Sequence, residues 1–154
     1  MESISAFEMI KVGIGPSSSH TMGPWIAAEL FLEYLSESDI PYNQIKEIEI
    51  HLYGSLAKTG KGHGTDVALL MGLSGEDYRS IDTTTINSKV ASIVNSKIIK
   101  LDQFHPIHFD YDRHLFFHKN ETKDHHPNTL VLKAILQNGA IAEKQYYSLG
   151  GGFV

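Results

Sequence analysis

The 154-residue sequence contains no cysteine, so this chain has no disulfide, no thiolate nucleophile and no cysteine-bound zinc or iron–sulfur centre. No apolar run approaches the roughly 20 residues of a membrane-spanning helix. The N-terminal segment lacks the basic stretch and apolar core of a secretion signal. With 13 Lys and Arg against 18 Asp and Glu, the net charge of −5 disfavours broad nucleic-acid binding. We therefore expect a cytoplasmic chain with no membrane or nucleic-acid partner.

The helices are predicted from the spacing of apolar residues. With 42% hydrophobic residues, residues 1–154 have enough apolar side chains for one globular domain. Apolar positions recur at helical spacing after a glycine- and serine-rich stretch, which predicts a helix that begins near residues 20–23. Pro24 fits its first turn, where the missing N–H does no harm. Two more helices are predicted, at residues 67–71 and 83–95. For the first of these, Thr65 or Asp66 is the expected N-cap and Gly72 the expected stop.

The strands are predicted from alternation and turn residues. Residues 45–53 place Ile48, Ile50 and Leu52 on one face and polar residues on the other. Asn138-Gly139 predicts a hairpin between residues 129–137 and 140–148. Shorter strands are expected at 98–101, 107–109 and 115–118, the last two joined by a turn at 110–113. Helices first and strands later indicate an α+β fold, which we expect to be an antiparallel sheet packed with helices.

The first candidate site is the stretch at residues 15–21, which holds three serines, a histidine and a threonine where the first helix begins. Backbone N–H groups at a helix N-terminus attract carboxylates and phosphates, and hydroxyls add further donors. No Gly-Lys-[Ser/Thr] follows at the required spacing, so this is not a Walker loop. The same residue types also cap ordinary helices, and both interpretations stay open at this point.

Three further stretches carry polar residues suited to chemistry. His63 lies between two glycines, which leaves its ring accessible, and imidazole suits proton transfer near neutral pH. His126 precedes Pro127 and Asn128, so it is presented from an extended segment. Ser148 precedes three glycines at the expected end of a strand. The alternative is a surface loop for His63 and for His126, and an ordinary strand end with a flexible exit for Ser148.

A local zinc site is disfavoured despite nine histidines. His114 and His118 have a chelating spacing only on a helix, whereas the sequence between them indicates a strand. Residues four apart on a strand are about 13 Å apart, too far to share one metal ion. We expect no metal ligands in this chain.

Five stretches together carry a family resemblance: SAFEMIK, GIGPSSSHTMGP, LYGSLAKTGKGHGTD, HPN and YYSLGGGFV, in this order. They resemble the N-terminal β domain of the single-chain, iron–sulfur-dependent L-serine dehydratases, or L-serine ammonia-lyases, over about residues 5–154. Glu8 and Trp25 stand where the family pattern has Asp and Met, and neither is at a chemical position. The resemblance also implies a fold like the allosteric substrate-binding domain of phosphoglycerate dehydrogenase.

The resemblance implies an enzyme that converts L-serine to pyruvate and ammonia. A cysteine-bearing catalytic domain of the same protein would hold a [4Fe–4S] cluster, which this chain does not bind, and a homodimer is expected. Two histidines match the proposed base or acid, with other polar residues as positioning groups. The implied catalytic set is His63, His126, Asn128 and Ser148. The implied substrate-binding set is Ser17, Ser18, Ser19, His20, Thr21 and Thr65.

Two other functions are compatible with the same residues. The domain would serve as a regulatory serine-binding or dimerisation module if all the chemistry belonged to the cluster domain. A simple anion-binding interaction domain is the third class, although such surfaces do not need histidines inside glycine-rich loops. The glycine-rich ending at residues 148–154 suggests truncation before the cluster domain. Without cysteine, the chain alone is expected to be inactive.

Overall fold

The computed structural model describes residues 21–58, 64–119 and 128–147. The polar segments at residues 15–20, 61–63, 124–127 and 148–154 lie outside the described residues. Most of the main helices and strands agree with the predicted ones. In chain order they are α2 (Met22–Glu37), η1 (Tyr42–Gln44), β1 (Ile45–Tyr53), α3 (Ser55–Lys58), α4 (Thr65–Leu73), η2 (Thr83–Thr85), α5 (Ile86–Ser96), β2 (Ile98–Leu101), β3 (His105–His108), α6 (Tyr111–His114), β4 (Leu115–His118), β5 (Thr129–Leu136) and β6 (Ile141–Tyr147).

The main sheet has four strands in the order β4-β1-β5-β6. β1 pairs antiparallel with β5, and β5 with β6, as the predicted hairpin requires. β4 runs parallel to β1, with Ile50 opposite Leu115 and Tyr53 opposite His118. The α+β class is confirmed, while the sheet is mixed rather than wholly antiparallel. The long connection from β1 to β4, which includes α4 and α5, allows this parallel pairing, because parallel strands need a crossover.

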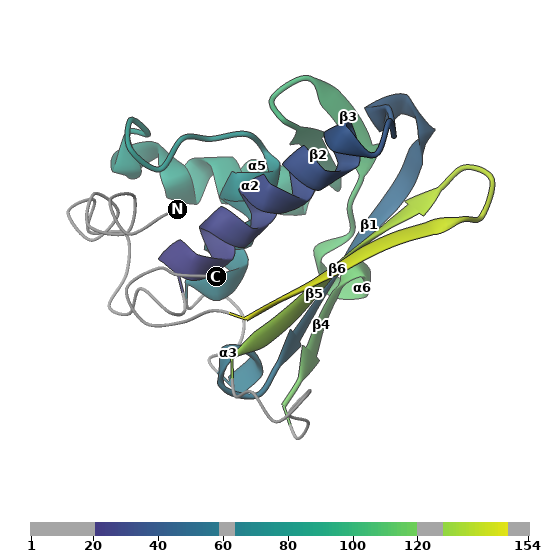
Figure 1. Cartoon of the computed structure of the whole chain (residues 1–154). Helices are drawn as coiled ribbons and strands as arrows, with labels where there is room; N and C mark the ends of the chain where they lie inside the picture. The colour runs from purple at the N-terminus through teal and green to yellow at the C-terminus, as the bar shows by residue number, and fades with distance from the viewer. Residues whose placement is uncertain (1–20, 59–63, 120–127, 148–154) are drawn as a thin grey trace.

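The sheet is packed on one face by helices, and Figure 1 shows α2 and α5 on the same side of it. The predicted alternation in β1 is confirmed, because Ile48, Ile50 and Leu52 are fully buried against this layer. In the core, the largest completely buried side chains are Trp25 and Phe31 of α2, together with Phe109. Burial of apolar area at about 25 cal/mol per Å² therefore stabilises the contact between the helix layer and the sheet.

Helices α2 and α4 pack closely through Gly72. A Cβ atom added at Gly72 would lie 2.6 Å from Cβ of Ala28 and 2.8 Å from the backbone oxygen of Trp25. Gly72 lies inside α4, which ends at Leu73, so it is not the predicted stop. Its lack of a side chain allows the close contact with α2. The indole Nε1 of Trp25 donates a hydrogen bond to the carbonyl of Glu76 at 3.0 Å.

Other boundaries differ for local reasons. α4 begins at Thr65 with Gly64 as N-cap at φ +118°, a conformation open to glycine, so neither Thr65 nor Asp66 is the cap. α3 was not predicted in the glycine-rich segment, and the turn at 110–113 is the short helix α6. In the β5–β6 hairpin, Gly139 takes φ +89° and its N–H bonds to the carbonyl of Leu136 at 2.9 Å.

Strands β2 and β3 form a separate two-stranded antiparallel sheet. Its tip has left-handed backbone at Asp102 and Gln103, at φ 52° and 69°. The tip is attached to the end of α4, because the N–H of Asp102 bonds to the carbonyl of Leu73 at 3.0 Å. The Gln103 side chain donates to the carbonyl of Gly75 at 2.9 Å. This attachment holds β2 beside the C-terminal end of α4.

Candidate functional site

The starts of α2 and α4 touch each other at Thr21 and Gly64. A Cβ atom on Gly64 would lie 2.8 Å from Cγ2 of Thr21, so only glycine allows this approach. Thr21 and Thr65 are 1% and 0% exposed, unusual burial for polar side chains. First-turn N–H groups have no acceptor within their own helix, and the helix dipole makes this end positive. Two of the predicted substrate-binding residues are thereby brought to one end of the helix pair.

Asp66 adds a buried carboxylate at the same helix start. It is 1% exposed, and one of its oxygens accepts from the N–H of Val67 at 2.9 Å. The other oxygen accepts a hydrogen bond from the hydroxyl of Tyr111. A buried carboxylate needs such donors because it has lost its water. The pair fixes the start of α4 against α6, which sequence reasoning did not anticipate.

Asn128 is held by a second pair of polar side chains. The Ser55 hydroxyl donates a hydrogen bond to Oδ1 of Asn128. Ser55 begins α3 directly after β1, and Asn128 directly precedes β5. This bond fixes Oδ1 of Asn128 toward Ser55, so the NH₂ group of the same amide points away from Ser55. Sequence reasoning proposed Asn128 and missed Ser55, because a serine in a glycine-rich segment does not indicate its partner.

The Ser55–Asn128 pair lies at one end of the main sheet. Tyr53 and His118, the last residues of β1 and β4, lie opposite each other there. At the same end, Thr129, the first residue of β5, pairs with Tyr147, the last residue of β6. In Figure 1 this end of the sheet points toward α3 and the start of α2. Because β1 runs antiparallel to β5, the end of β1 lies beside the start of β5, which brings Ser55 and Asn128 together.

Three described side chains form a hydrogen-bonded chain on the sheet face opposite the helices. His51 Nε2 lies 3.0 Å from a Glu49 carboxylate oxygen, and His51 Nδ1 lies 2.9 Å from His118 Nε2. Since a carboxylate only accepts, His51 donates to Glu49 through Nε2 and accepts at Nδ1. Burial lowers the pKa of His51. The ring is therefore neutral at pH 7, and this chain helps to hold β1 and β4 in register.

Most of the predicted site residues lie outside the described residues, so their positions stay predictions. They are Ser17, Ser18, Ser19, His20, His63, His126 and Ser148. Thr21, Thr65 and Asn128 are described. The residues that sequence reasoning missed are Ser55 and Tyr111, each of which holds a predicted or adjacent polar group in place. Burial of Asp66 could have indicated that a donor was required, but not which one.

Within residues 21–58, 64–119 and 128–147, no group of three His, Cys, Asp or Glu side chains is placed to hold a metal ion. The whole sequence has no cysteine, so the residues of this chain do not fit an iron–sulfur cluster held by thiolates. In the same described ranges, no helix has both the length and the apolar character needed to cross a membrane.

The fold and these contacts define an α+β domain with buried polar side chains at two helix starts and a polar pair at one end of its sheet. Residues 5–154 match the family described as serine dehydratase beta chain. The chain therefore belongs to the serine dehydratase beta-chain family.

Curated relatives cover nearly the whole chain. It is 42% identical over 155 residues to an L-serine dehydratase of Helicobacter pylori, covering all of this chain and 33% of that protein. It is 41% identical over 152 residues to L-serine dehydratase of Streptomyces coelicolor, covering 98% and 33%. L-serine dehydratase 1 of Escherichia coli is 38% identical over 152 residues, with the same shares. The chain thus spans about a third of the length of these relatives.

Proposed function

We propose that this chain is the β domain of an L-serine ammonia-lyase that converts L-serine to pyruvate and ammonia. The remaining two thirds of the relatives' length would correspond to a cysteine-bearing catalytic domain that holds a [4Fe–4S] cluster. This division of labour agrees with the absence of cysteine from the chain. The homodimer that the resemblance implies is part of the same proposal.

The observation that carries the proposal is the contact between the starts of α2 and α4. It joins the GPSSSHT and TGKGHGTD motifs, which are far apart in the sequence, through Thr21 and Gly64. Two helix starts with buried threonines suit a carboxylate, the one group that L-serine keeps throughout the reaction. We assign Thr21 and Thr65, with Ser17, Ser18, Ser19 and His20, to the substrate carboxylate.

The same reaction needs a base and an acid. The α-proton of L-serine goes to a base, and the β-hydroxyl takes a proton and leaves as water. The resulting enamine tautomerises to an imine, which water hydrolyses to pyruvate and ammonia. We assign the two proton transfers to His63 and His126. Asn128, oriented by Ser55, and Ser148 would position the substrate.

The proposal is tested by pyruvate release from L-serine under anaerobic conditions, with the full-length enzyme after reconstitution with iron and sulfide. His63→Ala and His126→Ala are each expected to lower turnover by about 10²–10⁴-fold, the usual range for a general acid or base. His108→Ala is the matched control, because His108 is exposed on β3, away from this end of the sheet. Near-normal turnover in both test variants would contradict the assignment.

The regulatory function is distinguished by the saturation curve. If the domain only binds serine as an effector or forms the dimer, the variants will weaken activation by serine and retain turnover at saturation. The 154-residue chain alone is expected to release no pyruvate. Release by the chain alone would show that the reaction does not depend on a second domain.

A further inference from the structure

A pocket of about 520 Å³ lies between the C-terminal end of α4, one face of α5 and β2. This volume is within the range of about 300–1,000 Å³ typical of small-molecule sites. It is separate from the polar end described above, because Thr65 begins α4 whereas the pocket contacts its last residues. Along the helix, Met71 of the pocket lies six residues from Thr65, about 9 Å at 1.5 Å per residue.

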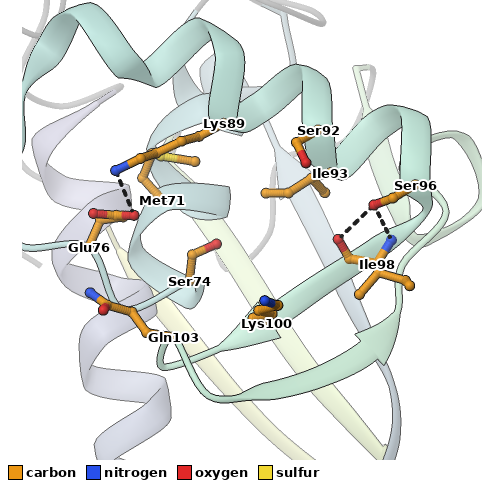
Figure 2. A pocket seen from close by; sticks show the side chains of 10 residues that line it. All are labelled: Met71, Ser74, Glu76, Lys89, Ser92, Ile93, Ser96, Ile98, Lys100 and Gln103. Atoms are coloured by element: carbon orange, nitrogen blue, oxygen red, sulfur yellow. Dashed lines mark hydrogen bonds and ion pairs between the residues drawn. The ribbon is translucent and has the colours of Figure 1, made fainter.

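The wall on α5 comes from side chains at one helical face. Lys89, Ser92, Ile93 and Ser96 follow the i, i+3, i+4, i+7 spacing that places residues on one side of a helix. Figure 2 shows these side chains above the pocket, with Lys100 below them. Polar and apolar groups therefore face the same space.

The apolar part of the pocket lining is partly open to water. It is formed by Met71, Ile93 and Ile98. Met71 and Ile93 are buried, whereas Ile98 is 44% exposed, a large fraction for an isoleucine. A ligand with a branched alkyl group would cover Ile98 and remove this apolar area from water.

The charges on the wall favour an anion. The ammonium of Lys89 pairs with the carboxylate of Glu76 at 2.9 Å, so these charges offset each other. Lys100 also lines the pocket, and among the residues that the structure describes its ammonium makes no ion pair. It leaves the lining with a net charge of +1. The hydroxyl of Ser92 likewise has no hydrogen-bond partner within the described ranges, whereas Ser74 donates to the carbonyl of Leu70 at 2.7 Å.

We propose that this pocket binds a small monocarboxylate with a branched alkyl body. The carboxylate would lie between Lys100 and the Ser92 hydroxyl, with the alkyl group on Ile93 and Ile98. A charge-assisted hydrogen bond to the ammonium supplies the preference for an anion over its neutral amide. L-Serine is a poor match, since it carries an ammonium group and has no apolar body.

The probe is 4-methylpentanoate, titrated into the ¹⁵N-labelled 154-residue chain and followed by amide chemical shifts. Saturable shifts are expected at Ser74, Ser92 and Ile98. The neutral analogue 4-methylpentanamide is expected to bind at least about tenfold more weakly, because it loses the charge-assisted hydrogen bond. Acetate should bind more weakly still, because it lacks the alkyl group. Equal affinity for the amide, for acetate or for L-serine would overturn the proposal.

Two variants keep the proposal testable without disturbing the fold. Lys100→Gln, on an exposed position of β2, is expected to weaken 4-methylpentanoate binding about tenfold or more. Ser92→Phe is expected to abolish binding by filling the space from the exposed side of α5. Lys46→Gln, also exposed on a strand, is the matched control and should bind normally. An equal loss in the control would show that only overall charge matters, which would overturn the assignment of the pocket.

Discussion

The two ends of the α2–α4 helix pair are packed by different chemistry. At the helix starts, Thr21 and Thr65 are buried, and Asp66 bonds to the backbone of Val67 and to Tyr111. Further along the two helices the contacts are apolar, and Gly72 allows α4 to contact the backbone of Trp25 and the side chain of Ala28. The apolar end sets the distance between the helices. The polar end, whose groups need partners or a ligand, is where the motifs of the family meet.

Carboxylates at the two ends experience opposite electrostatic environments. Asp66 lies in the first turn of α4, where the helix dipole favours a negative charge. Glu29 of α2 lines a hollow with Asp77 and Arg79, beyond the last turn of α4. Burial and then the charge of Asp77 raise the pKa of Glu29 to about 7. The comparison indicates that a negative charge is favoured in the first turn of α4 and disfavoured at the position of Glu29.

The largest expected effect comes from separating the helices at the apolar end. Gly72→Val places a side chain against the Trp25 backbone and should lower the free energy of unfolding by about 3 kcal/mol, as overpacking does. Urea unfolding followed by circular dichroism measures it. Asn87→Ala, at an exposed position of α5, is the control and should change stability by less than about 0.5 kcal/mol. A Gly72→Val protein as stable as its parent would contradict this packing.

The next effect tests the polar end. Tyr111→Phe removes one hydroxyl that donates to the buried Asp66 carboxylate. It should lower the free energy of unfolding by about 2 kcal/mol, since a buried charge loses a hydrogen bond. Differential scanning calorimetry measures the change. Tyr147→Phe, at a 37% exposed position, is the matched control. A similar loss in both variants would mean that the Tyr111–Asp66 hydrogen bond contributes no more to the free energy of unfolding than the hydroxyl of a partly exposed tyrosine.

A smaller stability effect should accompany a larger functional one at Thr65. Thr65→Val keeps the shape of the buried side chain and removes its hydroxyl, which costs about 1 kcal/mol. In the full-length enzyme, pyruvate release from L-serine should fall by about tenfold or more if the hydroxyl contacts the substrate. Thr85→Val is the control, because its hydroxyl bonds to the carbonyl of Asp82 away from this end. Equal turnover in the two variants would exclude Thr65 from the site.

The last effect is confined to a range of pH and concerns Glu29. Its folded pKa of about 7 lies above the unfolded value of 4.5, so the folded state binds more protons between these values. Stability should therefore fall as pH rises from about 4.5 to 7. Glu29→Gln should remove this loss. Relative to the parent, the free energy of unfolding of the variant should therefore be about 1–2 kcal/mol more favourable at pH 8 than at pH 4, allowing for partial solvation. Urea titrations at both pH values measure it.

Glu37→Gln, exposed on the same helix, is the control for Glu29. It should show the same stability difference from the parent at pH 4 and pH 8. A Glu29→Gln protein with the same flat response would mean that the carboxyl group of Glu29 is ionised in the fold as freely as in water.

Elements with strong local signals were predictable from the sequence. The boundaries of β1, β2 and β4 are confirmed, as are the hairpin at Asn138-Gly139 and the start of α2. The predicted stop at Gly72 is wrong because the residue serves a contact with α2, which no local pattern reveals. The hydrogen bonds from Ser55 to Asn128 and from Tyr111 to Asp66 join residues 73 and 45 positions apart, so spacing alone could not have indicated them.

The sequence by itself determined the α+β class, most of the strands and the family, because periodicity, turn residues and long motifs are local properties of the chain. Only the tertiary structure decided that β4 runs parallel to β1, that Thr21 meets the start of α4, and that Tyr111 holds Asp66. These features depend on which surfaces are buried together. Burial of a polar group is stable only when a partner from elsewhere in the fold replaces its water.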